Sequence, residues 1–254
     1  MNHVPPAVAV DQDYARYTAA DRRVWQTLFE RQMQVLPTVA ARRFVDGLPT
    51  VDFRADKIPD FAQVNPLLAT ATGWQLVAVP GIVDDRTFFE LLAARRFPAT
   101  TWLRTPAQLD YLEEPDMFHD VFAHVPLLTD PYFTDFLQAL GVLALRYLHE
   151  GHAVELLSRL YWFTAEFGLI AEGDRLRIYG AGILSSAGET TFCLGEAAVR
   201  RPFDVAVVLA TPYVKDRMQD MYFVIDSYAQ LAAAVPVLEA ELRQRLPCPP
   251  KAVG

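Results

Sequence analysis

The sequence predicts a mainly α fold with small β elements, organised as a single domain. Three observations predict it. First, 52% of the 254 residues are hydrophobic and 21% are charged, a composition that can bury a sizeable core and argues against global disorder. Second, apolar residues recur at helical spacing through most of the chain, and short apolar or β-branched runs separate these stretches. Third, no internal repeat or low-complexity linker divides the chain, whose length suits one large domain or two small ones.

The first part of the chain is expected to combine helices with two short strands. Val24 and Leu28 recur at helical spacing, and Pro37 interrupts that helix because proline lacks the backbone N–H. Asp84 and Asp85 can cap a later helix. The expected helices cover residues 21–36, 38–45, 60–72 (interrupted by Pro66) and 86–96, and the expected strands cover residues 75–79 and 100–103.

The rest of the chain follows the same pattern after Pro115. Gly180-Ala181-Gly182 breaks a strand-like run, and residues 185–188 are expected to continue as a loop. The expected helices cover residues 116–124, 132–149, 153–170 and 227–245 (with a break near Pro236), and the expected strands cover residues 176–179, 205–209 and 221–225. Residues 1–12 and the proline-rich residues 247–254 are expected to be frayed tails.

Charge and targeting signals narrow the function classes. The net charge is −8, from 23 basic and 31 acidic residues, and no basic run occurs, which disfavours nucleic acid and anionic membranes as partners. The N-terminus lacks the pattern of a secretory signal, and no apolar run is long enough for a membrane span. Cys193 and Cys248 are too far apart for a CxxC site. These features predict a cytoplasmic protein.

Two of the five histidines form a candidate metal pair. His119 and His124 are separated by mostly apolar residues in the pattern HxxxxH. On an ideal α-helix the second ring would be rotated about 140° from the first, so the two would not share a face. Pro126 disfavours helix at Val125, which would leave His124 at a helix end where its ring can turn back toward His119. A satisfied core or surface role for each histidine remains the alternative.

Glu166 supplies a candidate third ligand. It is the one charged residue in the segment 160–170, which is otherwise apolar or aromatic and expected to be buried. A buried carboxylate is costly unless it is paired with a cation or bound to a metal, so an arginine partner is the alternative. Two imidazoles and a carboxylate form the facial triad of non-haem iron(II) enzymes, although catalytic zinc uses the same ligands. The polar pair His149 and His152 is better explained as a solvated connection.

Three segments carry a resemblance to a known family. They are Glu114–Leu128 around the histidine pair, Tyr161–Ile170 around Glu166, and Tyr179–Glu189. In this order and with these separations, they resemble the signatures of the pterin-dependent aromatic amino acid hydroxylases, and the likeness extends over residues 13–231. The short bacterial phenylalanine hydroxylases are the most similar members. The resemblance implies a single catalytic domain of that type.

The resemblance also implies roles for individual residues. His119, His124 and Glu166 would bind Fe(II) and carry the catalysis. The positions that match the pterin site are Val83, Phe88, Asp120 and Tyr161, with Phe88 stacked on the pterin ring and Asp120 facing it through water. The positions that match the amino acid site are Arg104, Asp116, Trp162, Phe167, Gly182 and Ser185. Arg104 would bind the substrate carboxylate, and Asp116 would orient Arg104. From the residues alone, Phe88, Trp162 and Phe167 are equally compatible with ordinary core positions.

The implied reaction is the hydroxylation of L-phenylalanine to L-tyrosine with Fe(II), a tetrahydropterin and O2. Ala123 stands where the family usually has glycine, and Ala187 stands where animal members have phenylalanine, so tryptophan or another ring position remains open as the alternative. A zinc hydrolase and a non-catalytic binding protein are alternatives of other classes. Because the chain lacks the regulatory domain and oligomerisation helix of animal members, the resemblance implies a monomer.

Overall fold

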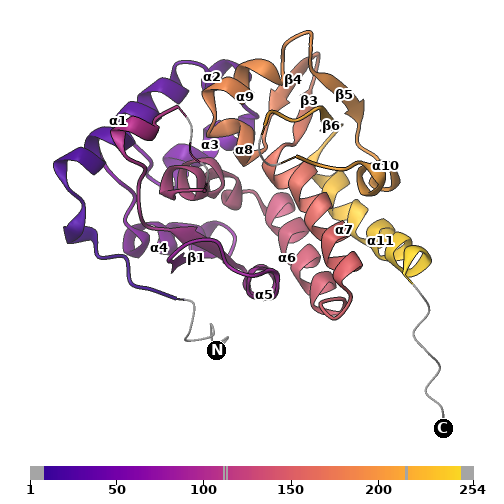
Figure 1. The fold of residues 1–254 in the computed structure, drawn as a ribbon. Helices are drawn as coiled ribbons and strands as arrows, with labels where there is room; N and C mark the ends of the chain where they lie inside the picture. The colour runs from indigo at the N-terminus through magenta and orange to yellow at the C-terminus, as the bar shows by residue number, and fades with distance from the viewer. Residues whose placement is uncertain (1–8, 111, 113, 215–216, 247–254) are drawn as a thin grey trace.

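The computed structural model describes residues 9–110, 112, 114–214 and 217–246 (Figure 1). Helices dominate this part of the chain and the strands are short, as the sequence predicts. Most of the expected tails, residues 1–8 and 247–254, lie outside the described residues. Residues 9–12 differ from the expected fraying: the Val10 N–H donates to the Ala78 carbonyl (2.9 Å) and the Gln12 amide donates to the Pro59 carbonyl (2.9 Å).

Short helices form the N-terminal part, at the left of Figure 1. They are η1 (Tyr14–Arg16), α1 (Ala19–Met33), α2 (Leu36–Val39), α3 (Arg42–Thr50) and α4 (Phe61–Ala71). A capping box between Thr18 and Asp21 starts α1. The predicted helix 38–45 is wrong. Ala40 has extended backbone and pairs with Ile178, so that α2 ends at Val39 and α3 starts at Arg42.

A parallel strand pair follows, β1 (Gln75–Val79) and β2 (Arg96–Thr100), connected by α5 (Asp85–Ala93). Asp84 caps α5, as predicted. The predicted strand 100–103 is wrong, because the chain turns at Arg95, which has a φ of 57°, and enters β2 at once. Pro98 cannot donate a ladder hydrogen bond, but β2 has a neighbour on one side only in this two-stranded sheet and tolerates it.

The middle of the chain carries wide and tight helical turns beside ordinary α-helices. A 3-10 turn, η2 (Pro106–Gln108), precedes the π-helix η3 (Phe118–Ala123) and the 3-10 helix η4 (Val125–Thr129). The long helices α6 (Pro131–Leu145) and α7 (Gly151–Tyr161) follow, and α7 runs into a second π-helix, η5 (Trp162–Glu166). The predicted helix 116–124 is helical as the π-helix η3, and the predicted helix 153–170 is helical only as far as Glu166, as α7 followed by η5.

A four-stranded sheet in the order β4-β3-β6-β5 lies at the upper right of Figure 1. Its strands are β3 (Leu169–Glu172), β4 (Arg175–Ile178), β5 (Val199–Pro202) and β6 (Met221–Ile225). β3 replaces the end of the predicted helix 153–170, since Gly173, with a φ of 60°, turns the chain into an antiparallel pairing with β4. The predicted strand 221–225 is confirmed.

The remaining helices are α8 (Ala181–Leu184), α9 (Ala187–Phe192), α10 (Val205–Ala210) and α11 (Tyr228–Arg245). The predicted strand 205–209 is wrong: the Asp204 side chain caps this segment as α10, and the capping bond outweighs the β-branched composition. The predicted break at Pro236 is absent: α11 continues through this proline, packs along α6 (Figure 1), and buries Leu231, Leu238 and Leu242.

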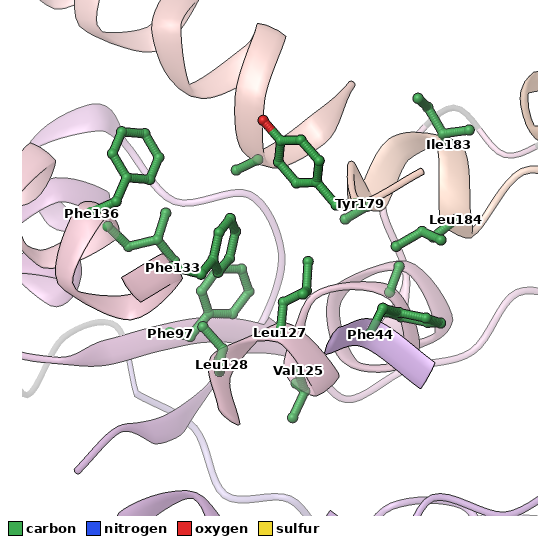
Figure 2. Packing of buried hydrophobic residues seen from close by; sticks show 14 of the residues in the cluster. Phe44, Phe97, Val125, Leu127, Leu128, Phe133, Phe136, Tyr179, Ile183 and Leu184 are labelled. Atoms are coloured by element: carbon green, nitrogen blue, oxygen red, sulfur yellow. The ribbon is translucent and has the colours of Figure 1, made fainter. Parts of the chain in front are cut away.

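One hydrophobic cluster connects these elements, from Val24 in α1 to Leu242 in α11. Figure 2 shows a part of it, in which Phe133 on α6 faces Tyr179 beside β4, with ring centroids 6.3 Å apart. Phe44, Val125, Leu127 and Leu128 pack on the same region (Figure 2). Phe44 also packs on Phe122, with ring centroids 5.8 Å apart, which anchors the apolar side of the π-helix η3. None of the helices described is long and apolar enough to cross a membrane.

Candidate metal centre and adjoining cleft

The two π-helices bring His119, His124 and Glu166 together. Nε2 of His119 lies 3.4 Å from Oε2 of Glu166, and Nε2 of His124 lies 3.1 Å from Oε1. The three potential ligand atoms lie within 4.8 Å of one another, and no other group of this kind occurs in the described part of the chain. The predicted convergence of these three side chains is therefore present.

The backbone that achieves this convergence differs from the expected one. A π-helix hydrogen-bonds residues five apart and so has wider turns than an α-helix. Residues five apart, such as His119 and His124, therefore lie above one another, and their ring centroids are 5.1 Å apart. His124 is the C-cap of η3, and Val125 and Pro126 open the 3-10 helix η4. The prediction that His124 lies at a helix end is confirmed, but the α-helical rotation of 140° does not apply.

The electrostatics of the site favour a cation. Burial would raise the pKa of Glu166, but His124 and His119 outweigh it and hold that pKa well below its usual range. Burial lowers the pKa of His119, whereas the Glu166 carboxylate outweighs burial and raises it. The carboxylate thus stays ionised and attracts positive charge at the imidazoles. A divalent ion between the three side chains would supply that charge, so the ligand set fits a metal of the non-haem iron type.

Ser185 holds the first histidine in place. Its Oγ lies 2.9 Å from Nδ1 of His119, and the hydroxyl also donates to the Ala181 carbonyl (2.9 Å). Because a hydroxyl has a single proton, Oγ accepts from Nδ1–H, which leaves the lone pair of Nε2 facing Glu166. The resemblance assigns Ser185 to the amino acid pocket, and the structure adds a contact with a potential metal ligand.

Arg104 and Asp116 form a buried pair, as expected. Nε and Nη2 of Arg104 donate to Oδ2 and Oδ1 of Asp116 at 2.9 and 2.8 Å. The Arg104 backbone N–H donates to Oδ2 (2.9 Å), and the His119 N–H donates to Oδ1 (3.2 Å). Asp116 therefore fixes the guanidinium relative to the start of η3. Arg104 is 7% exposed and Asp116 is fully buried.

A cleft of about 620 Å³ contains three of the four predicted pterin-site residues, and the ring of one of them, Tyr161, lies 6.5 Å from the His124 ring. Val83, Phe88 and Tyr161 line the cleft, and the rings of Phe88 and Tyr161 lie edge to face with centroids 5.0 Å apart. Burial, followed by the Glu166 carboxylate, raises the pKa of Tyr161, so its hydroxyl stays protonated. The lining also includes residues that sequence reasoning missed: Asp85, Arg86, Glu155, Ser158 and Tyr213.

Asp120, the fourth predicted pterin-site residue, is not among the described residues that line the cleft. Its Oδ2 accepts from the backbone N–H and from the hydroxyl of Thr100, both at 2.8 Å. Burial raises its pKa, and the nearby His119 opposes that rise. Thr100 ends β2, so the parallel strand pair positions this carboxylate. No signal in the sequence indicates this role of Thr100.

Trp162, Phe167 and Gly182 form one continuous wall, as the resemblance implies. The rings of Trp162 and Phe167 have centroids 4.8 Å apart at 33°. A Cβ on Gly182 would lie 2.7 Å from Cζ of Phe167, so a side chain at this position would displace the Phe167 ring. Ala123 is fully buried in η3, and Ala187 is exposed at the first position of α9.

Comparisons with known proteins agree with this site. The family model of the biopterin-dependent aromatic amino acid hydroxylases matches residues 11–247. A phenylalanine-4-hydroxylase of Ralstonia nicotianae is 51% identical over 227 residues, which cover 89% of this chain and 72% of the relative. The crystal structure of Chromobacterium violaceum phenylalanine hydroxylase with bound iron(III) and 7,8-dihydrobiopterin has a TM-score of 0.89 at 46% identity, covering 97% of this chain and 90% of that one.

Proposed function

Because this chain belongs to the family of biopterin-dependent aromatic amino acid hydroxylases, we propose that it is a phenylalanine 4-monooxygenase. It uses Fe(II), a tetrahydropterin and O2 to convert L-phenylalanine to L-tyrosine. One oxygen atom enters the aromatic ring and the other leaves on the pterin, which supplies the two electrons. The observation that carries the proposal is the convergence of His119, His124 and Glu166 near an aromatic cleft, whose Tyr161 ring lies 6.5 Å from the His124 ring.

His119, His124 and Glu166 hold the iron in this proposal. Two imidazoles and one carboxylate leave coordination positions open for oxygen and water. The bound iron and the reduced pterin together supply oxygen activation and reducing equivalents. The protein contributes the rigidity of the three donors: Ser185 fixes the His119 tautomer, and the buried packing around His124, which is 3% exposed, limits access of water.

The cleft supports the pterin assignment. Phe88 is half-buried and contributes an aromatic face, Tyr161 contributes a second ring, and Val83 contributes an apolar edge. Planar heterocycles bind well between such side chains. Asp120, with one carboxylate oxygen held by Thr100, presents a hydrogen-bonding group on the η3 side.

The amino acid site combines a charged clamp with an aromatic wall. Arg104 binds the substrate carboxylate, and Asp116 keeps the guanidinium in one orientation through two side-chain hydrogen bonds. Trp162 and Phe167 contact the substrate ring, and Gly182 leaves room for the Phe167 ring. Ser185 completes the assigned set next to His119.

The experiment that tests the function is an assay of protein loaded with Fe(II) under anaerobic conditions. A tetrahydropterin, air and each aromatic amino acid are added in turn, and products are identified by mass and retention time. Tyrosine formed from phenylalanine, with one pterin consumed per tyrosine, is the expected result. If tryptophan is the only amino acid that is hydroxylated, the proposed substrate becomes tryptophan. No hydroxylation of any amino acid with iron bound would favour a zinc hydrolase or a binding protein.

We further propose that the chain works as one catalytic domain, as a monomer, in the cytoplasm. The hydrophobic cluster that runs from Val24 to Leu242 supports a single folding unit. Cys193 is a buried free thiol, and burial raises its pKa to about 12, which suits a reducing compartment. A single cooperative unfolding transition, a monomer mass in light scattering and recovery in the cytosolic fraction are the expected results.

A further inference from the structure

Gln219 is a fully enclosed polar side chain with a hydrogen-bond partner on each side of its amide. It is 2% exposed. Oε1 accepts from Nε1 of Trp162 (3.0 Å), and Nε2 donates to the Val214 carbonyl (2.8 Å). Its backbone N–H donates to Oε1 of Glu189 (3.1 Å), which also accepts from the Tyr222 hydroxyl. The segment before β6 is thus connected with η5 and α9.

The two ends of the amide cannot exchange. Nε1 of an indole is a donor only, so the amide oxygen must face Trp162, and a carbonyl is an acceptor only, so the amide nitrogen must face Val214. Burial of the group makes both bonds important, since an unpaired buried polar atom is costly. The Gln219 amide therefore has a single orientation, and its hydrogen bond fixes the orientation of the Trp162 indole.

Trp162 is the side chain that joins the cleft to the aromatic wall. It lines the cleft with Phe88 and Tyr161. Its ring lies between Phe167 and Tyr213, with centroid distances of 4.8 Å to each and interplanar angles of 33° and 31°. Stacking fixes the plane of the ring but leaves it free to slide within that plane. The hydrogen bond from Nε1 to Gln219 removes this freedom.

We propose that Gln219 is a positioning residue for the amino acid substrate: it fixes the in-plane position of Trp162 and thereby the shape of the pocket that receives the substrate ring. This inference rests on the proposed function. The contact acts on binding of the ring in the ground state and the transition state alike. Loss of the bond should therefore raise the amino acid KM and leave kcat nearly unchanged.

The first test compares Q219M and Q138M. Gln138 makes the same two kinds of bond elsewhere: its oxygen accepts from Arg95 (2.8 Å) and its amide nitrogen donates to the Ala93 carbonyl (3.2 Å). We expect Q219M to raise the KM for phenylalanine about 3- to 10-fold, with kcat within about 2-fold, as one hydrogen bond predicts. Q138M should lose stability without that change. An unchanged KM in Q219M, or a parallel fall in kcat in both variants, would overturn the proposal.

A double-mutant cycle with W162F tests whether Gln219 acts through the indole. Phenylalanine at 162 has no N–H, so Q219M should change the KM little in the W162F background. The same increase in both backgrounds would show that Gln219 acts by another route. Calorimetric binding of phenylalanine to metal-loaded protein under nitrogen gives the same comparison without catalysis.

Hydrogen exchange of the indole N–H is measured in the unaltered chain, and a variant is used only to assign the signal. The protein has four tryptophans, and W162F identifies the Trp162 signal in a nitrogen-15 spectrum. Although Trp162 is only half-buried, its N–H should exchange far more slowly than that of an exposed indole. Exchange at the exposed rate would refute the bond to Gln219. This result stands whether or not the protein hydroxylates phenylalanine, so the two proposals fail separately.

Discussion

The Ser185 hydroxyl accepts a hydrogen bond from Nδ1 of His119 across 66 positions of sequence, at 2.9 Å. The same hydroxyl donates its proton to Ala181 one helical turn earlier. Contacts of this kind orient a ligating imidazole and raise its basicity. The position of α8 beside η3 therefore helps to orient a candidate metal ligand.

Replacement of Ser185 by alanine should weaken metal binding about 10- to 100-fold, because the His119 ring loses its orienting partner. An anaerobic titration with Fe(II) or Co(II) measures it. Ser186 is the matched control: its Oγ caps α9 by accepting from the Glu189 N–H (3.2 Å). S186A should lower the free energy of unfolding by about 1 kcal/mol and leave metal affinity intact. Equal affinities for S185A and the unaltered protein would contradict the orienting role.

Replacement of Glu166 by alanine should abolish iron binding and activity while the fold survives, since the site loses its anionic ligand. Metal analysis and circular dichroism measure the two effects. E172A, at the last residue of β3, removes a carboxylate that accepts from the exposed Arg42 N–H (3.0 Å), and this variant should retain iron. Full iron occupancy in E166A would refute the ligand assignment.

Replacement of Arg104 by alanine should raise the amino acid KM about 10- to 100-fold with iron retained, as expected for the loss of charged hydrogen bonds to a carboxylate. The variant also leaves Asp116 buried without its partner, at a cost of about 3–5 kcal/mol in folding stability. Assays therefore belong at a temperature where denaturation curves show R104A folded. R104K, which keeps the charge without the bidentate geometry, should be intermediate. An unchanged KM in R104A would rule out the clamp.

Replacement of Gly180 by alanine should disturb the metal site through the backbone. A Cβ at this position would lie 2.4 Å from the Glu166 carbonyl oxygen and 2.4 Å from the Gly168 nitrogen, so the chain must move. We expect a loss of about 1–3 kcal/mol in urea unfolding and weaker iron binding. G151A has nothing within 4 Å of its added Cβ and should match the unaltered protein. If G180A is as stable as the unaltered protein, the close backbone contact of Gly180 with Glu166 and Gly168 does not require glycine.

The Asp84 cap of α5, a helix that lines the cleft, should contribute to the stability of the fold in a pH-dependent way. Asp84 accepts from the Thr87 N–H (3.0 Å) and hydroxyl (2.8 Å), and these bonds lower its pKa. Because the pKa of Asp84 is lower in the folded state than in the unfolded state, its carboxylate stabilises the fold at pH values above the unfolded-state pKa. This contribution disappears as the pH falls through the folded-state pKa. D84A should therefore cost about 1 kcal/mol at pH 7, and the difference should close below about pH 4. D85A should cost only a few tenths of a kcal/mol at either pH.

The three candidate metal ligands could be identified from the sequence because their chemistry is visible there, and the structure brings them together. Glu166 is the one charged residue in an apolar segment, and a buried carboxylate indicates a partner cation or a bound metal. The cap at Asp84 and the strand 75–79 were predictable from local signals as well. The fold class followed from the spacing of apolar residues over long stretches.

Other features depend on tertiary contacts that local patterns do not contain. The π-helix η3 carries no local mark, so an α-helical period misplaces the angle between His119 and His124. Val205–Leu209 has a strand-like composition, yet the Asp204 cap makes it helical. Gln219 meets Trp162 across 57 positions, a distance over which spacing conveys nothing.

The wide turn of η3 accommodates two different residue spacings in one stretch of chain. Phe118 and Phe122, four apart, stack in the core with centroids 4.5 Å apart at 9°, while His119 and His124, five apart, face the metal site. Deleting Asp120 or Val121 would give the histidines the four-residue spacing of an α-helix but would shorten the spacing of the aromatic pair from four residues to three. A designer who transplants this centre into a regular helical scaffold must therefore supply either the wide turn or a new anchor for one of the two pairs.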